Sequence, residues 1–105
     1  MIRLSILYPN SEGGRFDLDY YLNTHMPMSI EKQGSLLKGV SVEYGISGVQ
    51  PGTRPTYIVL CHFTYDSVEA FFEAFMPHAE LLQGDIQNYT NVEPVMQFSE
   101  VKLPQ

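Results

Sequence analysis

Three histidines are the residues best suited to chemistry, because imidazole titrates near neutral pH and can both accept and donate a proton. They are His25, His62 and His78. Their separations match neither HxxxH nor HExxH, and the chain has a single cysteine, so we expect no metal site. The motifs GxGxxG, GxxxxGK[ST] and GxSxG are also absent. We therefore expect proton transfer without a cofactor, carried by histidine, tyrosine and amide groups.

His25 lies where a predicted helix meets a proline. Four residues follow the i, i+3, i+4, i+7 spacing of an inward helical stripe: Leu18, Tyr21, Leu22 and His25. Asp17 can cap the start of this helix, and Pro27 predicts a kink or restart around Met26. Two interpretations of His25 are open. It can be a core histidine whose ring nitrogens are hydrogen-bonded to Tyr21 or to a backbone carbonyl that Pro27 leaves free. It can instead be a general acid/base at a pocket between helix and sheet.

Tyrosine is abundant in this sequence, with seven residues, and several of them fall on apolar faces or near the ends of elements. A buried phenol needs a hydrogen-bond partner, and one or two such hydroxyls could orient a polar group on a ligand. With His25 as the acid/base, the expected binding residues are Tyr8, Tyr21, His62, Tyr89 and Asn91. Asn91 would supply an amide at the mouth of the cleft.

Periodicity predicts the elements that position these side chains. Alternating apolar residues predict strands over residues 2–9, 38–46 and 91–101, and a run that is apolar on both faces predicts a strand over residues 56–65. A first helix runs from Asp17 to Gly34, and Asp66 or Ser67 opens a second. The second helix has a predicted buried stripe, formed by Val68, Phe71, Phe72, Phe75 and Met76, and Pro77 interrupts it. The order β-α-β-β-α-β is the ferredoxin-like α+β arrangement, one antiparallel sheet with both helices on one face.

The face of the sheet away from the helices is also apolar in this prediction. It carries Leu7, Ile58, Leu60, Val95 and Val101. An exposed apolar face of that size is an association site, and two sheets packed face to face would cover it. The sequence therefore predicts a homodimer.

Length and charge narrow the class of protein. The chain of 105 residues fits a single domain, residues 1–105. Its net charge is −6 and its six basic residues are scattered singly, so we expect no nucleic-acid partner. No apolar run approaches the ~20 residues that span a bilayer, so we expect no membrane partner and a cytoplasmic location.

Three segments carry a resemblance to a known family: FDLDYYLNTHMP, YIVLCHFTYDSVEAF and DIQNYTNVEPVMQFSEV. Together they cover the start, the centre and the end of the chain, which resembles the EthD family. That family belongs to the dimeric α+β barrel superfamily and is named for a role in degrading ethyl tert-butyl ether beside a cytochrome P450 system. By motif match, the histidine of HMP falls on His25, and the NYTN segment falls on Asn88 to Asn91.

The resemblance implies a small-molecule function. Relatives in the superfamily include cofactor-free monooxygenases, muconolactone isomerases and polyketide cyclases, which hold small ring compounds between helices and sheet. We expect a homodimer that binds a hydrophobic or aromatic metabolite and catalyses a cofactor-free oxygenation or a proton-transfer rearrangement. The alternative is a non-catalytic accessory protein of a P450-type oxidoreductase. A third interpretation, an assembly module, predicts that tyrosines and histidines fill the cleft solidly.

Overall fold

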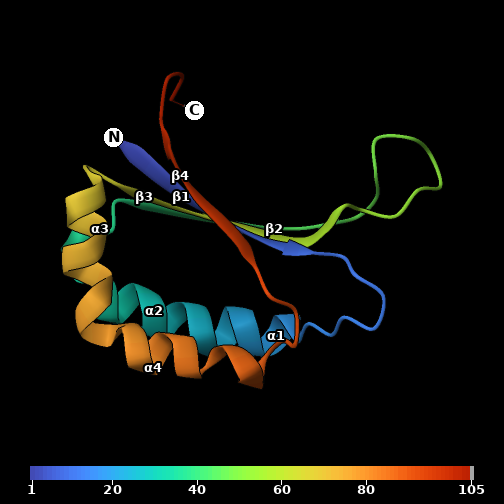
Figure 1. Cartoon of the computed structure of the whole chain (residues 1–105), viewed down its shortest axis with the longest axis horizontal. Helices are drawn as coiled ribbons and strands as arrows, with labels where there is room; N and C mark the ends of the chain where they lie inside the picture. Colours follow the sequence, from blue (N-terminus) through green and yellow to red (C-terminus); the bar gives the residue numbers. More distant parts are fainter. Residues whose placement is uncertain (105) are drawn as a thin grey trace.

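Four antiparallel strands form the sheet in the computed structural model, which describes residues 1–104 (Figure 1). The strands are β1 Ile2–Pro9, β2 Gly39–Tyr44, β3 Tyr57–Tyr65 and β4 Val95–Glu100. Their order across the sheet is β2-β3-β1-β4, so β4 lies at an edge, where Pro94 just before it is tolerated. The predicted ferredoxin-like α+β fold is confirmed.

Two helical stretches cover one face of this sheet (Figure 1). The first comprises α1 Leu18–Tyr20, the π-helical η1 Tyr21–His25, α2 Met26–Gln33 and the 3₁₀ turn η2 Gly34–Leu36. The second comprises α3 Val68–Phe75, η3 Met76–His78, α4 Ala79–Gly84 and η4 Ile86–Asn88. None of the helices within residues 1–104 has the length and apolarity required to cross a bilayer.

The first helix accommodates Pro27 without a break. Asp17 caps it as predicted, accepting a hydrogen bond from the backbone N–H of Tyr20 at 3.0 Å. The predicted kink around Met26 is replaced by the wide π turn, in which the Met26 N–H donates to the Tyr21 carbonyl and the backbone stays helical. This turn breaks the 3.6-residue period, so Leu22, predicted to face inward, is 43% exposed. Tyr21 and His25 are buried.

The buried side of the second helix is made of small residues. Ser67 caps it, and the buried residues of α3 are Ala70 and Ala74. The predicted burial is wrong for Phe72 and Met76, which are 47% and 57% exposed, whereas Val68, Phe71 and Phe75 are half-buried. The small alanines thus form the buried side of α3, while two of its bulky neighbours, Phe72 and Met76, are exposed.

The register of the strands determines which side chains lie on each face. Leu4, Tyr8 and Phe63 are buried under the helices, and so is Cys61, whose pKa burial raises to about 11. On the other face Leu7 pairs with Leu60 of β3 and with Val95 of β4. The open face of the sheet therefore carries an apolar cluster, defined here by Leu7, Leu60 and Val95.

Candidate functional site

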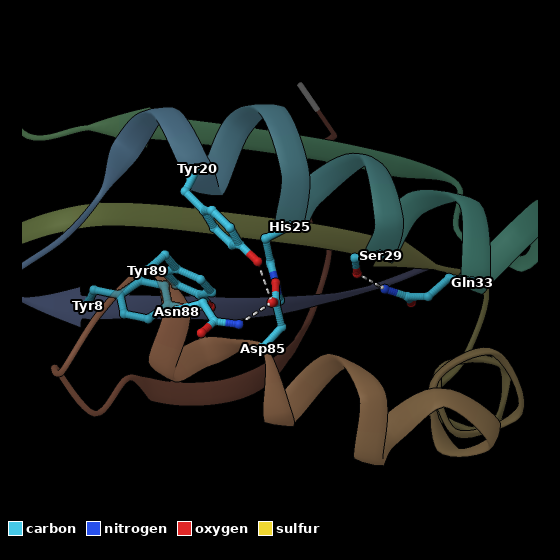
Figure 2. Close-up of polar contacts among 8 residues, drawn as sticks. All are labelled: Tyr8, Tyr20, His25, Ser29, Gln33, Asp85, Asn88 and Tyr89. Carbon is cyan, nitrogen blue, oxygen red and sulfur yellow. Dashed lines mark hydrogen bonds and ion pairs between the residues drawn. The ribbon is translucent and has the colours of Figure 1, made fainter.

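His25 and Asp85 form a largely buried pair between the two helical stretches. His25 ends η1, and Asp85 follows α4, 60 residues further along the chain. The distance from His25 Nδ1 to Asp85 Oδ2 is 2.9 Å, and the two side chains are only 10% and 11% exposed. Figure 2 shows the two side chains pointing toward each other from facing helices. His25 thus bonds neither to Tyr21 nor to a freed carbonyl, the two partners expected from its sequence context.

Asp85 is held by two further donors. The Tyr20 hydroxyl donates to Asp85 Oδ1 at 2.6 Å, and the Asn88 side-chain amide donates to the same oxygen at 2.9 Å (Figure 2). Burial alone would raise the pKa of Asp85, but the hydrogen bonds from Tyr20, Asn88 and His25 outweigh it and lower that pKa below its ordinary value. Asp85 is therefore a carboxylate at neutral pH.

The carboxylate fixes the tautomer of the neutral imidazole. An ionised Asp85 can only accept, so Nδ1 of His25 carries the hydrogen and Nε2 presents its lone pair. Tyr21 stacks on the ring at a centroid distance of 5.7 Å, and Tyr89 packs against it at 4.7 Å. Within residues 1–104, Nε2 has no hydrogen-bond partner. The arrangement is that of an oriented base.

A cavity of about 380 Å³ opens beside His25, between the sheet and the helices. Its walls are mostly apolar and include Leu4, Phe63, Phe71, Phe72, Phe75 and Met76. Four of the five residues of the predicted stripe on the second helix thus line the cavity. Of the residues that the structure describes, no lysine, arginine, aspartate or glutamate lines it. Such a cavity favours an uncharged, hydrophobic ligand.

The hydroxyl groups of Tyr8 and Tyr89 add a polar site to the apolar wall of the cavity. Their hydroxyls are 2.7 Å apart, so one donates to the other and one hydroxyl hydrogen remains for another acceptor. Burial raises the pKa of Tyr8 to about 12, and it raises the pKa of Tyr89 as well. Both side chains are therefore neutral phenols at physiological pH, able to donate a hydrogen bond but not to act as bases.

Comparison with solved structures decides the family. The structure is similar to that of an EthD-like protein from Ralstonia eutropha JMP134, with a TM-score of 0.94 and 40% sequence identity over 99% of this chain and 94% of that one. This chain belongs to the EthD family. An EthD family protein from Bacillus halodurans C-125 shares the fold, with a TM-score of 0.72 and 22% identity over 96% of this chain and 98% of that one. No protein-family model matches the sequence, and no curated protein does.

Two of the segments that resemble the EthD family, FDLDYYLNTHMP and DIQNYTNVEPVMQFSEV, supply most of this polar cluster. The histidine of HMP is the partner of Asp85, and the segment DIQNYTN contributes Asp85, Asn88 and Tyr89. Of the binding residues expected from the sequence, Tyr8 and Tyr89 line the cavity with His25. Tyr21 is fully buried behind the His25 ring instead of lining the cavity, so it supports the base and does not reach a ligand.

Two residues that were expected to bind the ligand in this EthD protein, His62 and Asn91, lie outside the cavity. His62 is on the open face of the sheet, where its Nδ1 is 2.9 Å from Ser5 Oγ and its Nε2 is 3.6 Å from Glu43 Oε1. Asn91 accepts from the backbone N–H of Arg15 at 2.7 Å and so ties two loops together. The structure does not bring either residue to the cavity that His25 lines.

Asp85, Tyr20 and Asn88 are functional candidates that the sequence reasoning missed. Asp85 and Asn88 are three residues apart in a polar turn, which has the composition of an ordinary surface turn. Asp85 and Asn88 could have been identified from their place in the DIQNYTN segment, and Tyr20 from its place in FDLDYYLNTHMP. Across residues 1–104 there is no group of three or more histidine, cysteine or acidic side chains arranged to hold a metal ion.

Proposed function

We propose that this EthD protein binds a small, uncharged, hydrophobic or aromatic ring compound and transfers a proton at that compound without a cofactor. The observation that carries the proposal is the position of His25, which is oriented by Asp85 and lines an apolar cavity. Nε2 of His25 is the base. The hydroxyl pair of Tyr8 and Tyr89 is a neutral donor that can hold a polar atom of the ligand.

The surroundings of His25 stabilise the positive charge that its ring carries after it has taken a proton from the ligand. When Nε2 takes a proton, the imidazolium forms 2.9 Å from the Asp85 carboxylate, which stabilises the positive charge. A base placed in this way accelerates a reaction by about 100- to 10,000-fold. Both a proton-transfer rearrangement and an oxygenation can start from the deprotonated ligand.

The test is deuterium exchange into β-tetralone, an uncharged two-ring ketone whose C–H bonds next to the carbonyl are acidic. The ketone is incubated in D₂O with the protein alone, and ¹H NMR follows the loss of the C–H signals. We expect exchange well above the rate in buffer. Native mass spectrometry of the same sample reports whether the ketone is bound. A bound ketone without exchange would contradict the catalytic role and would support a non-catalytic accessory protein of an oxidoreductase.

We also propose that the apolar cluster of the open sheet face, Leu7, Leu60 and Val95, is covered by the same face of a second copy. Val95 is more than half exposed in the single chain, and the three residues adjoin across the strands β3, β1 and β4. Exposed apolar clusters of this kind mark association sites, and two sheets can pack face to face about 10 Å apart.

Leu60→Lys is expected to convert this dimer to a monomer, because it would place a charge in the buried interface. Light scattering measures the mass of each form, which should be twice 11.9 kDa for the wild type and 11.9 kDa for the variant. Ile46→Lys is the matched control, since Ile46 is 90% exposed and lies outside the strands. A monomeric wild type, or a dimer that survives Leu60→Lys, would contradict the proposed interface.

A further inference from the structure

A second buried hydrogen-bond chain ends at the cavity. The Tyr65 hydroxyl donates to Oε1 of Gln33, and Nε2 of Gln33 donates to Ser29 Oγ at 3.0 Å (Figure 2 shows the latter bond). Ser29 and Gln33 are each only 3% exposed, and Tyr65 is fully buried. Ser29 is one of the residues that line the cavity. None of these three residues has a part in the proton transfer described above.

The hydrogen bonds from Tyr65 through Gln33 to Ser29 all run in one direction, from donor to acceptor. Burial raises the pKa of Tyr65, so its phenol keeps the hydrogen at neutral pH, and the hydroxyl donates that hydrogen to Gln33 Oε1. The side-chain oxygen of Gln33 accepts this hydrogen, which leaves the amide NH₂ of Gln33 to face Ser29. The Ser29 oxygen is consequently used as an acceptor, and its own hydrogen is available. Helical serines often donate that hydrogen to the carbonyl one turn earlier, but within residues 1–104 the Ser29 hydroxyl makes no such bond and contacts only the Gln33 amide.

Ser29 stands one helical turn after His25, on the same side of the helix. Four residues correspond to a rise of about 6 Å along the axis, so the two side chains are neighbours on the cavity wall. One presents an unprotonated nitrogen and the other a hydroxyl hydrogen. A ligand that uses both needs an acceptor oxygen and an acidic C–H bond a short distance apart.

We propose that Ser29 binds the carbonyl oxygen of the ligand while His25 takes a proton from the adjacent carbon, so that the substrates are uncharged, enolisable ring ketones. The proposal rests on the proposed function, and it names the substrate class. The apolar walls hold the ring, and among the described residues no lysine or arginine lines the cavity to pair with a carboxylate.

The proton and the electrons balance in this step without an oxidant. Nε2 of His25 takes the proton from the carbon next to the carbonyl, and the C–H electron pair becomes a carbon–carbon double bond. The carbonyl π electrons move to the oxygen, whose negative charge the Ser29 O–H stabilises. The imidazolium then returns a proton, or a deuteron in D₂O, to the same carbon or to another position of the enolate.

Ser29→Ala tests this assignment through two ligands that differ only in the carbonyl. The dissociation constants of β-tetralone and of the hydrocarbon tetralin are measured by calorimetry for the wild type, for Ser29→Ala and for the exposed control Ser35→Ala. Loss of one hydrogen bond should weaken β-tetralone binding by about three- to tenfold in Ser29→Ala. Tetralin binding should be unchanged, and Ser35→Ala should resemble the wild type with both ligands.

The outcomes separate this proposal from the proposed function. Equal weakening of both ligands in Ser29→Ala would indicate a packing role for Ser29 and would overturn the proposal, as would unchanged β-tetralone binding. In either case, exchange of deuterium by the wild type would leave the function of His25 intact. A wild type that binds both ligands but exchanges no deuterium would contradict the proton transfer and, with it, the step assigned to Ser29. Binding of neither ligand would overturn both proposals.

Discussion

Replacement of His25 by glutamine is expected to lower the rate of deuterium exchange into β-tetralone by about 100- to 10,000-fold. Glutamine has a similar size and keeps an amide that can bond to Asp85, but it cannot accept a proton from carbon. The apolar residues of the cavity walls are unchanged by the substitution, so tetralin should bind the variant as it binds the wild type. The exchange rate is measured by ¹H NMR at equal concentrations of bound ketone.

The matched control for this experiment is His78→Gln. His78 lies in η3 and does not line the cavity, so its replacement should leave the exchange rate near that of the wild type. If His25→Gln retained the full exchange rate, His25 would not be the base. Circular dichroism of both variants confirms that the fold is kept.

Asp85→Asn is the second substitution with a large expected effect, and the hydrogen-bond network dictates its result. Tyr20 and Asn88 both donate to Oδ1 of Asp85, so the oxygen of the new amide must occupy that position. Its NH₂ group then faces Nδ1 of His25 and donates to it, which moves the imidazole hydrogen to Nε2. The base is lost although His25 is present. We expect exchange to fall by at least about 100-fold.

Asp19→Asn is the control for this change of charge, because Asp19 lies exposed on α1, one residue before Tyr20. It removes one negative charge without altering the network and should keep the wild-type exchange rate. A normal rate in Asp85→Asn would show that the tautomer of His25 does not matter and would remove Asp85 from the mechanism. Tetralin affinity, measured in parallel, shows whether the cavity is intact.

The fold could be predicted because its signals are local. Alternation in β1 places Leu4 under the helices, an unbroken apolar run identifies β3, and the caps Asp17 and Ser67 mark where the helices begin. The burial of the stripe on α3 could not be predicted from spacing alone. Apolar spacing identifies the apolar side of a helix, but the distance to the facing sheet decides whether that side is filled or lines a cavity.

The candidate site could be predicted only in part. His25 and Tyr8 follow from local pattern, because each lies on the inward side of its own element. Asp85 could not be found in this way, since its partner His25 is 60 residues away and its own turn looks solvent-exposed. The π turn at η1 was also not predicted. The sequence shows Pro27 but does not show that the preceding turn widens so that the helix continues through it.

The most direct test of the central claim is ¹⁵N NMR of the protein labelled at histidine, recorded at a pH where the rings are neutral and repeated with β-tetralone added. We expect His25 to carry its hydrogen on Nδ1, and we expect the Nε2 resonance of His25 to shift with the ketone while the resonances of His62 and His78 do not. A hydrogen on Nε2 of His25 in the free protein, or a ketone that leaves the His25 resonances unmoved, would contradict the assignment of His25 as the base in a ligand-binding cavity.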